Sequence, residues 1–313
     1  MITVTCVRHG ETVDNVGQLW AGWKDSQLTQ HGMNQARAVG AYFGDETTGI
    51  RIHAMYASPL SRAFLTAQQI QSQQPLEHRP PLTPTDLLKE QFWGDAEGHP
   101  FTWGPPPSKD DETDAAGKYA PLTSRTSSFP NGESSDDVAR RVDLFISEFI
   151  IPHVLASQAD EETTLNIFVV SHGIAIAELI GAFLRRDPSV AKQAPETWRG
   201  LMNTAWTRME ITTRIETSHP PPITPSTRVK SSDPPLSVRI TAVNQYSHLA
   251  NVKRQRGGIG SSAYDPKQSS IKTSLVGIRE APLLKQGSSE IQPWGYGQLI
   301  FPVYCLLLFS WPY

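Results

Sequence analysis

The chain contains little cysteine. Only Cys6 and Cys305 occur in 313 residues, and they lie near opposite ends of the sequence. Two cysteines placed in this way form neither a disulfide framework nor a cluster of metal ligands, which favours a reducing compartment. An excess of one charge is also missing, since the net charge is −3 and the pI is about 6.3. Nothing in the composition therefore implies an obligatory nucleic-acid partner.

Long apolar segments are absent as well. The first residues lack the basic region, the apolar stretch and the small-residue cleavage site of a signal peptide. An apolar run at residues 299–309 is interrupted by Pro302 and is shorter than the about 20 residues that a membrane helix needs. We therefore expect a cytoplasmic protein without a membrane partner. The basic residues 253–256 leave the nucleus open as an additional location.

Apolar segments with the periods of strands and helices alternate along the chain. Strands are predicted at residues 2–7, 52–57 and 165–170, with late strands at 204–215 and 237–243. Helices are predicted after Thr29, after a Ser58-Pro59 cap, from about Asp136 and from Ile174. This alternation predicts an α/β fold, a three-layer α/β/α sandwich with a mainly parallel sheet.

Residues 1–249 are predicted to form one domain with two irregular segments. An excursion at about residues 98–131 is rich in Pro, Asp, Ser and Thr, and an insertion at about 216–236 is rich in Pro. Periodicity disappears from about residue 250, so we expect residues 250–313 to form a mostly disordered tail.

Three groups of polar residues directly follow predicted strands. Arg8-His9, residues 58–62 with Arg62, and His172 each lie at the carboxyl end of a strand, which is the edge where open α/β sheets bind ligands. Two guanidinium groups bind a phosphoryl group well, and the helix N-termini after Ser58 and His172 add N–H donors. Neighbouring cations disfavour protonation of His9, which leaves a nitrogen lone pair free for nucleophilic attack.

Protonation of a leaving group also needs an acid. Glu90 is the best candidate, because a carboxyl group beside a bound phosphate dianion can hold a proton near neutral pH. Glu97 is a rival for this role, and an ordinary solvated carboxylate remains the alternative reading of Glu90. No Asp, Glu or His spacing is typical of a two-metal phosphatase, so we expect neither a metal nor a cofactor.

The order and spacing of these residues resemble a known family. Residues 8–12, 21–25, 58–63, 88–94, 131–134 and 170–173 are similar to the signature of the histidine phosphatase superfamily, in its phosphoglycerate-mutase-like branch. The ordered set covers about residues 1–215, and such a set is far more specific than one motif alone. The resemblance implies a phosphohistidine intermediate on a phosphoglycerate-mutase-like fold. Its implied roles are His9 as the phosphorylated residue, Glu90 as proton donor, Arg8, Arg62 and His172 as phosphate ligands, Asn15 in the pocket, and Thr12 and Gly173 as lesser contributors.

Departures from the family pattern bear on the type of reaction. Ala21 stands where many members have Gln, and residues 98–131 lack the paired arginines of the mutases. We therefore expect a metal-independent phosphomonoester phosphatase acting on a small phosphorylated metabolite. The alternatives are a phosphomutase and a non-catalytic domain that recruits partners. Residues 252–260 are similar to the tails of fungal members, and no pattern specifies an oligomeric state.

Overall fold

The computed structural model describes residues 1–48, 50–101, 119–158, 164–190, 195–214 and 233–267. Its centre is a six-stranded sheet in the order β3-β2-β4-β1-β5-β6. The strands are β1 (Ile2–Arg8), β2 (Ile52–Ala57), β3 (Leu82–Pro84), β4 (Leu165–Ser171), β5 (Trp206–Thr213) and β6 (Leu236–Gln245). The pairings among β3, β2, β4 and β1 are parallel, and β5 and β6 join antiparallel.

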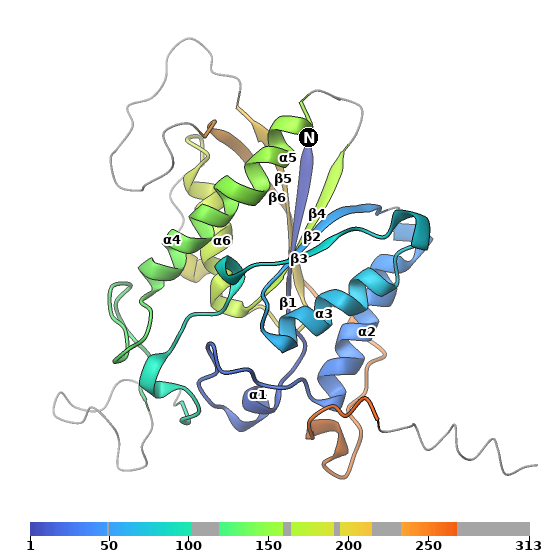
Figure 1. The fold of residues 1–313 in the computed structure, drawn as a ribbon, viewed down its shortest axis with the longest axis vertical. Coiled ribbons are helices and arrows are strands. Elements are labelled where there is room, and N and C mark those ends of the chain that lie inside the picture. Colours follow the sequence, from blue (N-terminus) through green and yellow to red (C-terminus); the bar gives the residue numbers. More distant parts are fainter. Residues whose placement is uncertain (49, 102–118, 159–163, 191–194, 215–232, 268–313) are drawn as a thin grey trace, which may run out of the picture. The chain divides into compact units, whose positions relative to one another are not determined.

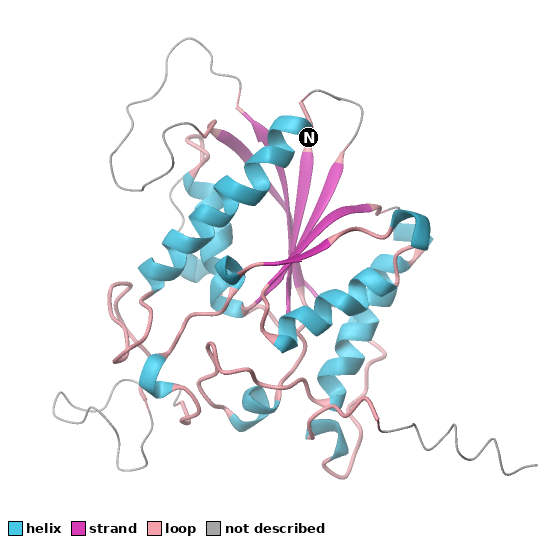
Figure 2. Cartoon of the chain, viewed as in Figure 1, coloured by secondary structure: helices cyan, strands magenta, loops and turns pink. Residues whose placement is uncertain are grey.

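Helices cover both faces of the sheet, as Figures 1 and 2 show. Helices α2 (Gln30–Gly44) and α3 (Ser61–Ser72) pack on one face, while α4 (Ser135–Phe145), α5 (Ile151–Ala156) and α6 (Gly173–Arg185) pack on the other. A short helix, α1 (Val13–Gly17), follows the end of β1. The predicted α/β sandwich with a mainly parallel sheet is confirmed, with two antiparallel strands at one edge.

Alternation along the strands builds two apolar cores. In β1, Ile2, Val4 and Cys6 join the core beneath α4 and α6, whereas Val7 joins the core beneath α2 and α3. Successive side chains of a strand point to opposite faces, so one strand supplies both layers. No helix in the part of the chain that the structure describes is long and apolar enough to span a membrane.

The strand register determines which residues meet at the carboxyl edge. Arg8 of β1 pairs with Ser171 of β4, and Ala57 of β2 pairs with Val170 of β4. The residues that follow these positions, His9, His172 and Ser58, therefore leave the sheet next to one another. Parallel pairing with short exits places this polar set at a single point.

One local prediction is wrong and one boundary moves. Ser58 does not cap α3, because that helix begins at Ser61 with Leu60 as its N-cap. A π-helical turn at residues 146–150 joins α4 to α5. The start of the tail, expected at residue 250, lies later, because the compact unit extends to Asp265 and Tyr264 packs beside Leu28.

The two irregular segments are described only in part. Residues 102–118 of the excursion, residues 216–232 of the Pro-rich insertion and residues 268–313 of the tail lie outside the described residues. The described flanks of the excursion are joined by a bridge between Phe101 and Tyr119, and Pro100 pairs with Leu19. Pro100 and Tyr119 of the excursion therefore lie beside the loop that follows α1.

Candidate active site

His9 stands at the end of β1 with its ring held in a fixed orientation. Its Nδ1 lies 2.7 Å from the carbonyl oxygen of Gly10, so Nδ1 carries the proton and Nε2 keeps its lone pair. The side chain is 4 % exposed. Burial, followed by the charges of Arg62 and Arg8, holds the pKa of His9 well below its usual value, although the bond to Gly10 acts in the opposite direction.

His172 faces His9 across the site. The centroids of the two rings are 5.0 Å apart, with an angle of 59° between the ring planes. Burial and then the charge of Arg62 lower the pKa of His172 well below its usual value. Both imidazoles are therefore neutral at physiological pH, as a nucleophile and an uncharged hydrogen-bond donor require.

Ser58 determines which nitrogen of His172 carries the proton. Its Oγ lies 2.8 Å from His172 Nε2 and also accepts the N–H of Leu60. Among the described residues, Nε2 is the acceptor available to the Ser58 hydroxyl proton, so Ser58 donates to it and the proton of His172 resides on Nδ1. This Nδ1 is buried and has no partner within the described part of the chain. Our sequence analysis assigned no such role to Ser58.

The charges of Arg8 and Arg62 act on both histidines. Arg8 donates Nη1–H to the carbonyl of Leu201, and its Nε is buried without a partner among the described residues. Arg62 is 1 % exposed and donates to the carbonyls of Ala21, Gly22 and Lys24. Burial lowers the pKa of each guanidinium, and the charge of Glu90 raises it. Both guanidinium groups remain charged at neutral pH, because an arginine side chain is not deprotonated in proteins.

Glu90 lies beside these cations and accepts backbone hydrogen bonds. Oε1 accepts the N–H groups of Gln91 (3.0 Å) and Ala175 (3.1 Å), and Oε2 accepts the N–H of Ile174 (3.2 Å). Two N–H groups of the first turn of α6 are therefore occupied by Glu90. Our expectation that the amides after His172 are free for an anion is wrong for Ile174 and Ala175. Likewise, at the start of α3 the N–H of Ser61 is bonded to Asp25.

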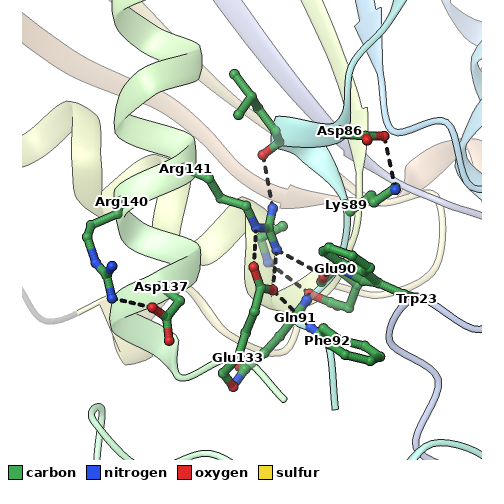
Figure 3. A network of polar contacts seen from close by, with 12 residues as sticks. Trp23, Asp86, Lys89, Glu90, Gln91, Phe92, Glu133, Asp137, Arg140 and Arg141 are labelled. Carbon is green, nitrogen blue, oxygen red and sulfur yellow. Dashed lines mark hydrogen bonds and ion pairs between the residues drawn. The ribbon is translucent and has the colours of Figure 1, made fainter. Parts of the chain in front are cut away.

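A network of polar contacts holds the backbone of Glu90, as Figure 3 shows. Arg141 of α4 donates to the carbonyls of Leu87 and Glu90, each at 2.9 Å, and forms an ion pair with Glu133. The indole N–H of Trp23 also donates to the carbonyl of Glu90, at 2.9 Å. These contacts fix an irregular loop that has no regular backbone pairing of its own.

Asn15 and Thr12 are joined in a capping box at the start of α1. The Thr12 hydroxyl accepts the N–H of Asn15, and the Asn15 amide oxygen accepts the N–H of Thr12. Asn203, which our sequence analysis missed, donates to the carbonyl of His9 at 3.1 Å and to the side chain of Asn15 at 3.3 Å. Its only sequence signal is a polar pair, Asn203-Thr204, immediately before a buried strand.

Gly173 provides space at the edge of the site. A Cβ atom at this position would lie 3.8 Å from Arg8 Nε and 3.9 Å from Glu90 Oε2. These two groups therefore flank Gly173. The structure thus brings Arg8, His9, Arg62, Glu90, His172 and Gly173 together, with Asn15 and Thr12 on the adjoining turn.

Glu97, the rival acid, has a different position. Its Oε1 accepts the N–H of Trp23 at 2.5 Å, and its Oε2 accepts the N–H of Lys24 at 2.6 Å. It therefore holds the loop at residues 21–24, whose carbonyls in turn hold Arg62.

No cluster of three or more His, Cys, Asp or Glu side chains suited to a metal occurs among the residues that the structure describes.

Comparisons with known proteins agree on one family. The sequence profile of the histidine phosphatase superfamily (branch 1) matches residues 4–217. A 2,3-bisphosphoglycerate-dependent phosphoglycerate mutase of Bartonella bacilliformis is 32 % identical over 181 residues, which are 57 % of this chain and 79 % of the relative.

Solved structures share the fold. A mycobacterial structure described as hydrolase 1 aligns with a TM-score of 0.57 at 22 % identity, over 78 % of this chain and 99 % of its own. A mycobacterial glucosyl-3-phosphoglycerate phosphatase aligns with a TM-score of 0.52 at 25 % identity, over 66 % of this chain and 89 % of its own. The similar proteins thus include both a mutase and a phosphatase.

Proposed function

The chain belongs to the histidine phosphatase superfamily, and we propose that it is a phosphomonoester phosphatase that works through a phosphohistidine on His9. The observation that carries this proposal is a pair of neutral, buried imidazoles 5.0 Å apart, close to the buried guanidinium of Arg62 and to the buried Nε of Arg8, whose charges lower the pKa of His9. A neutral imidazole is a nucleophile, and the guanidinium groups neutralise the phosphoryl charge. The proposed substrate is a small phosphorylated metabolite, and the proposed reaction requires no metal.

In the first step, Nε2 of His9 attacks phosphorus in line with the leaving oxygen. The N–P bond forms as the P–O bond to the substrate breaks, and the leaving oxygen takes a proton from Glu90. Of the two carboxyl oxygens, Oε2 accepts a single hydrogen bond whereas Oε1 accepts two. We assign the transferable proton to Oε2, because that oxygen has an unused lone pair.

In the second step, water replaces the alcohol. The Glu90 carboxylate takes a proton from water as its oxygen attacks phosphorus, and the P–N bond breaks. Inorganic phosphate leaves, and His9 returns to its neutral form with Nδ1 still bonded to Gly10. Glu90 is then protonated again, so the cycle closes without an external reagent.

The other predicted residues bind the phosphoryl group in this proposal. Arg8 Nε and His172 Nδ1 are buried donors at the site without a partner among the described residues. Donors of this kind bind phosphoryl oxygens more strongly as the phosphoryl group gains charge. Arg62 adds a second positive charge at the site. The roles of Asn15, Thr12 and Gly173 remain predictions, in which they shape the wall of the pocket next to His9.

Hydrolysis is favoured over phosphoryl transfer to a second substrate by two features of the chain. Within residues 98–131 the sole arginine is Arg125, and it forms a two-pronged pair with the buried carboxylate of Glu178. Ala21 contributes a carbonyl to Arg62 rather than a polar side chain to the pocket. The similarity to a named mutase supports the alternative, a phosphomutase that uses the same first step.

The direct test is release of phosphate from an aryl phosphate by the purified chain. We expect turnover that resists a chelator, and rapid quenching should trap an acid-labile phosphohistidine without acid-stable phosphoserine. Replacing the nucleophile, His9→Ala, should lower kcat by about 10⁴-fold or more. A His9→Ala protein that keeps most of its activity would remove His9 as the nucleophile.

An isotopically labelled substrate distinguishes a mutase from a phosphatase. A phosphatase transfers the label to free phosphate, and a mutase transfers it to an isomer of a phosphorylated sugar acid with little free phosphate. Predominant label in the isomer would reverse our assignment while leaving His9 as the phosphorylated residue.

The dependence of the rate on the leaving group shows whether Glu90 or Glu97 is the acid. Glu90→Gln should slow an alkyl phosphate about 100-fold or more, and should slow an activated aryl phosphate much less, because a good leaving group needs no acid. Glu97→Gln should slow both substrates by a similar factor, since Glu97 holds the loop at residues 21–24. The reverse pattern would assign the acid to Glu97.

A further inference from the structure

The segment that follows β6 returns to the site. Residues 246–264, which we name the C-terminal strap, include the basic, glycine-rich run at residues 252–260 that the proposed chemistry does not use. In the colours of Figure 1 the strap is the orange segment beside the start of α2. It contacts two side chains close to His9, those of Glu11 and Thr204.

The first contact is an ion pair with the loop of the nucleophile. The guanidinium of Arg254 places Nη1 2.8 Å from Glu11 Oε1, and Nη2 donates to Glu11 Oε2. Glu11 is two residues after His9, and Oε1 also accepts the hydroxyl of Thr29. A two-pronged pair fixes the orientation of the carboxylate as well as its distance.

Backbone pairing anchors the strap next to this ion pair. Tyr264 N–H donates to the carbonyl of Leu28 at 2.8 Å, and Gln30 N–H donates to the carbonyl of Ser262 at 3.0 Å. Thr29, which lies between these two positions, donates its N–H to the carbonyl of Glu11. Residues 28–30 therefore bond to the loop at residues 9–12 as well as to the strap.

The second contact reaches His9 through Thr204, which precedes β5. His248 Nε2 lies 3.0 Å from the hydroxyl of Thr204, whose N–H bonds the carbonyls of Arg8 and His9. Thr204 has a φ of 59°, which is costly for a β-branched residue and persists when its surroundings impose it. The strap therefore supports the backbone on both sides of the nucleophile.

We propose that the C-terminal strap positions the nucleophile, with Arg254 as the principal positioning residue acting through Glu11. This inference rests on the proposed function. The side chain of Arg254 is 40 % exposed and that of Glu11 is 13 % exposed. Ion pairs of this exposure contribute little to stability, whereas a small displacement of a reacting group slows the chemical step strongly. Loss of the pair therefore affects the reaction more than the fold.

The test compares Arg254→Ala with the unaltered chain in single-turnover experiments. We expect phosphohistidine formation to slow about tenfold, while the inhibition constant of inorganic phosphate changes less than twofold because Arg8 and Arg62 are untouched. Arg254→Lys should restore part of the rate, since an ammonium keeps the charge but not the two-pronged geometry. Arg256→Ala, which removes an exposed cation two residues away, is the matched control and should react at the original rate.

A double-variant cycle adds a second readout. The Glu11→Ala and Arg254→Ala changes together should slow phosphohistidine formation no more than Glu11→Ala alone, because both remove one interaction. An unchanged rate in Arg254→Ala, or an equal loss in Arg256→Ala, would overturn the proposal. A large rise in the phosphate inhibition constant would also overturn it, by assigning Arg254 to binding. Failure of the unaltered chain to form phosphohistidine would instead refute the proposed function.

Discussion

Replacing Ser58 by alanine gives the sharpest test of how His172 is held in this site. Ser58 and His172 are both fully buried, and their side chains are 2.8 Å apart. Ser58→Ala leaves the buried Nε2 of His172 without the hydroxyl that donates to it. An unsatisfied buried group costs about 1–3 kcal/mol, which for a domain of this size lowers Tm by roughly 2–12 °C.

The larger effect is expected on the reaction. Without Ser58 the proton of His172 is free to move to Nε2, and Nδ1 then presents a lone pair instead of an N–H to the phosphoryl group. Loss of one preorganised donor to a developing oxyanion costs about 10²-fold to 10³-fold in kcat. We expect Ser58→Ala to lower kcat by about 10²-fold while the phosphohistidine still forms on His9.

Two measurements check this prediction. Nitrogen chemical shifts of the imidazoles report the tautomer of His172 in both proteins, and steady-state kinetics report kcat. The matched control is Ser157→Ala, which removes a buried hydroxyl that donates to the carbonyl of Val154 at 2.9 Å in α5. It should lower Tm to a comparable extent and leave kcat unchanged. Equal kcat for Ser58→Ala and the unaltered chain would refute the role of Ser58.

Three further predictions follow from burial and close contacts. Burial and nearby guanidinium groups lower the pKa of His9 and His172 well below 6.5, so only the unfolded chain takes up protons as the pH falls through 6.5. Stability should then be full above that pH and fall by up to about 1.4 kcal/mol per pH unit per histidine below it; a flat urea midpoint between pH 7 and 5 would contradict this. Gly22→Ala should lower the free energy of unfolding by about 1–3 kcal/mol, because its Cβ would lie 2.2 Å from a backbone oxygen. Gly17→Ala is the control, because its Cβ would make ordinary contacts from 3.4 Å, and it should unfold near the original urea midpoint. Arg141→Lys should lower kcat about tenfold, mainly with poor leaving groups, because the loop of the acid loses its two carbonyl contacts; an equal effect on all leaving groups would argue against it.

The residue types and their places after strands could be predicted from the sequence. Strand alternation and helical spacing located the ends of β1, β2 and β4, and parallel pairing then required Arg8, His9 and His172 to meet. The chemistry followed from the side chains themselves, since arginines and an uncharged imidazole suit phosphoryl transfer whatever loop carries them.

Other features had no local signal. A Ser-Pro pair after a strand is typical of a helix cap. The hydrogen bond from Ser58 to His172, 114 residues away, could therefore not be predicted from the sequence. Glu90 lies in an irregular loop that Arg141 holds from α4, and its contacts with the first turn of α6 depend on that placement. The sequence analysis did not predict that residues 250–265 are ordered. Contacts such as the pair of Arg254 with Glu11, 243 residues away, hold this segment, and such contacts leave no periodicity in the sequence.

The sequence by itself determined five of the six described strands, the long helices and the proposed kind of chemistry, because these depend on spacing and on side chains within one short segment. Only the tertiary structure decided the tautomer of His172, the contacts of Glu90 and the attachment of the strap. Each of these is a hydrogen bond or an ion pair between distant segments. Its geometry exists only after the sheet and helices have packed.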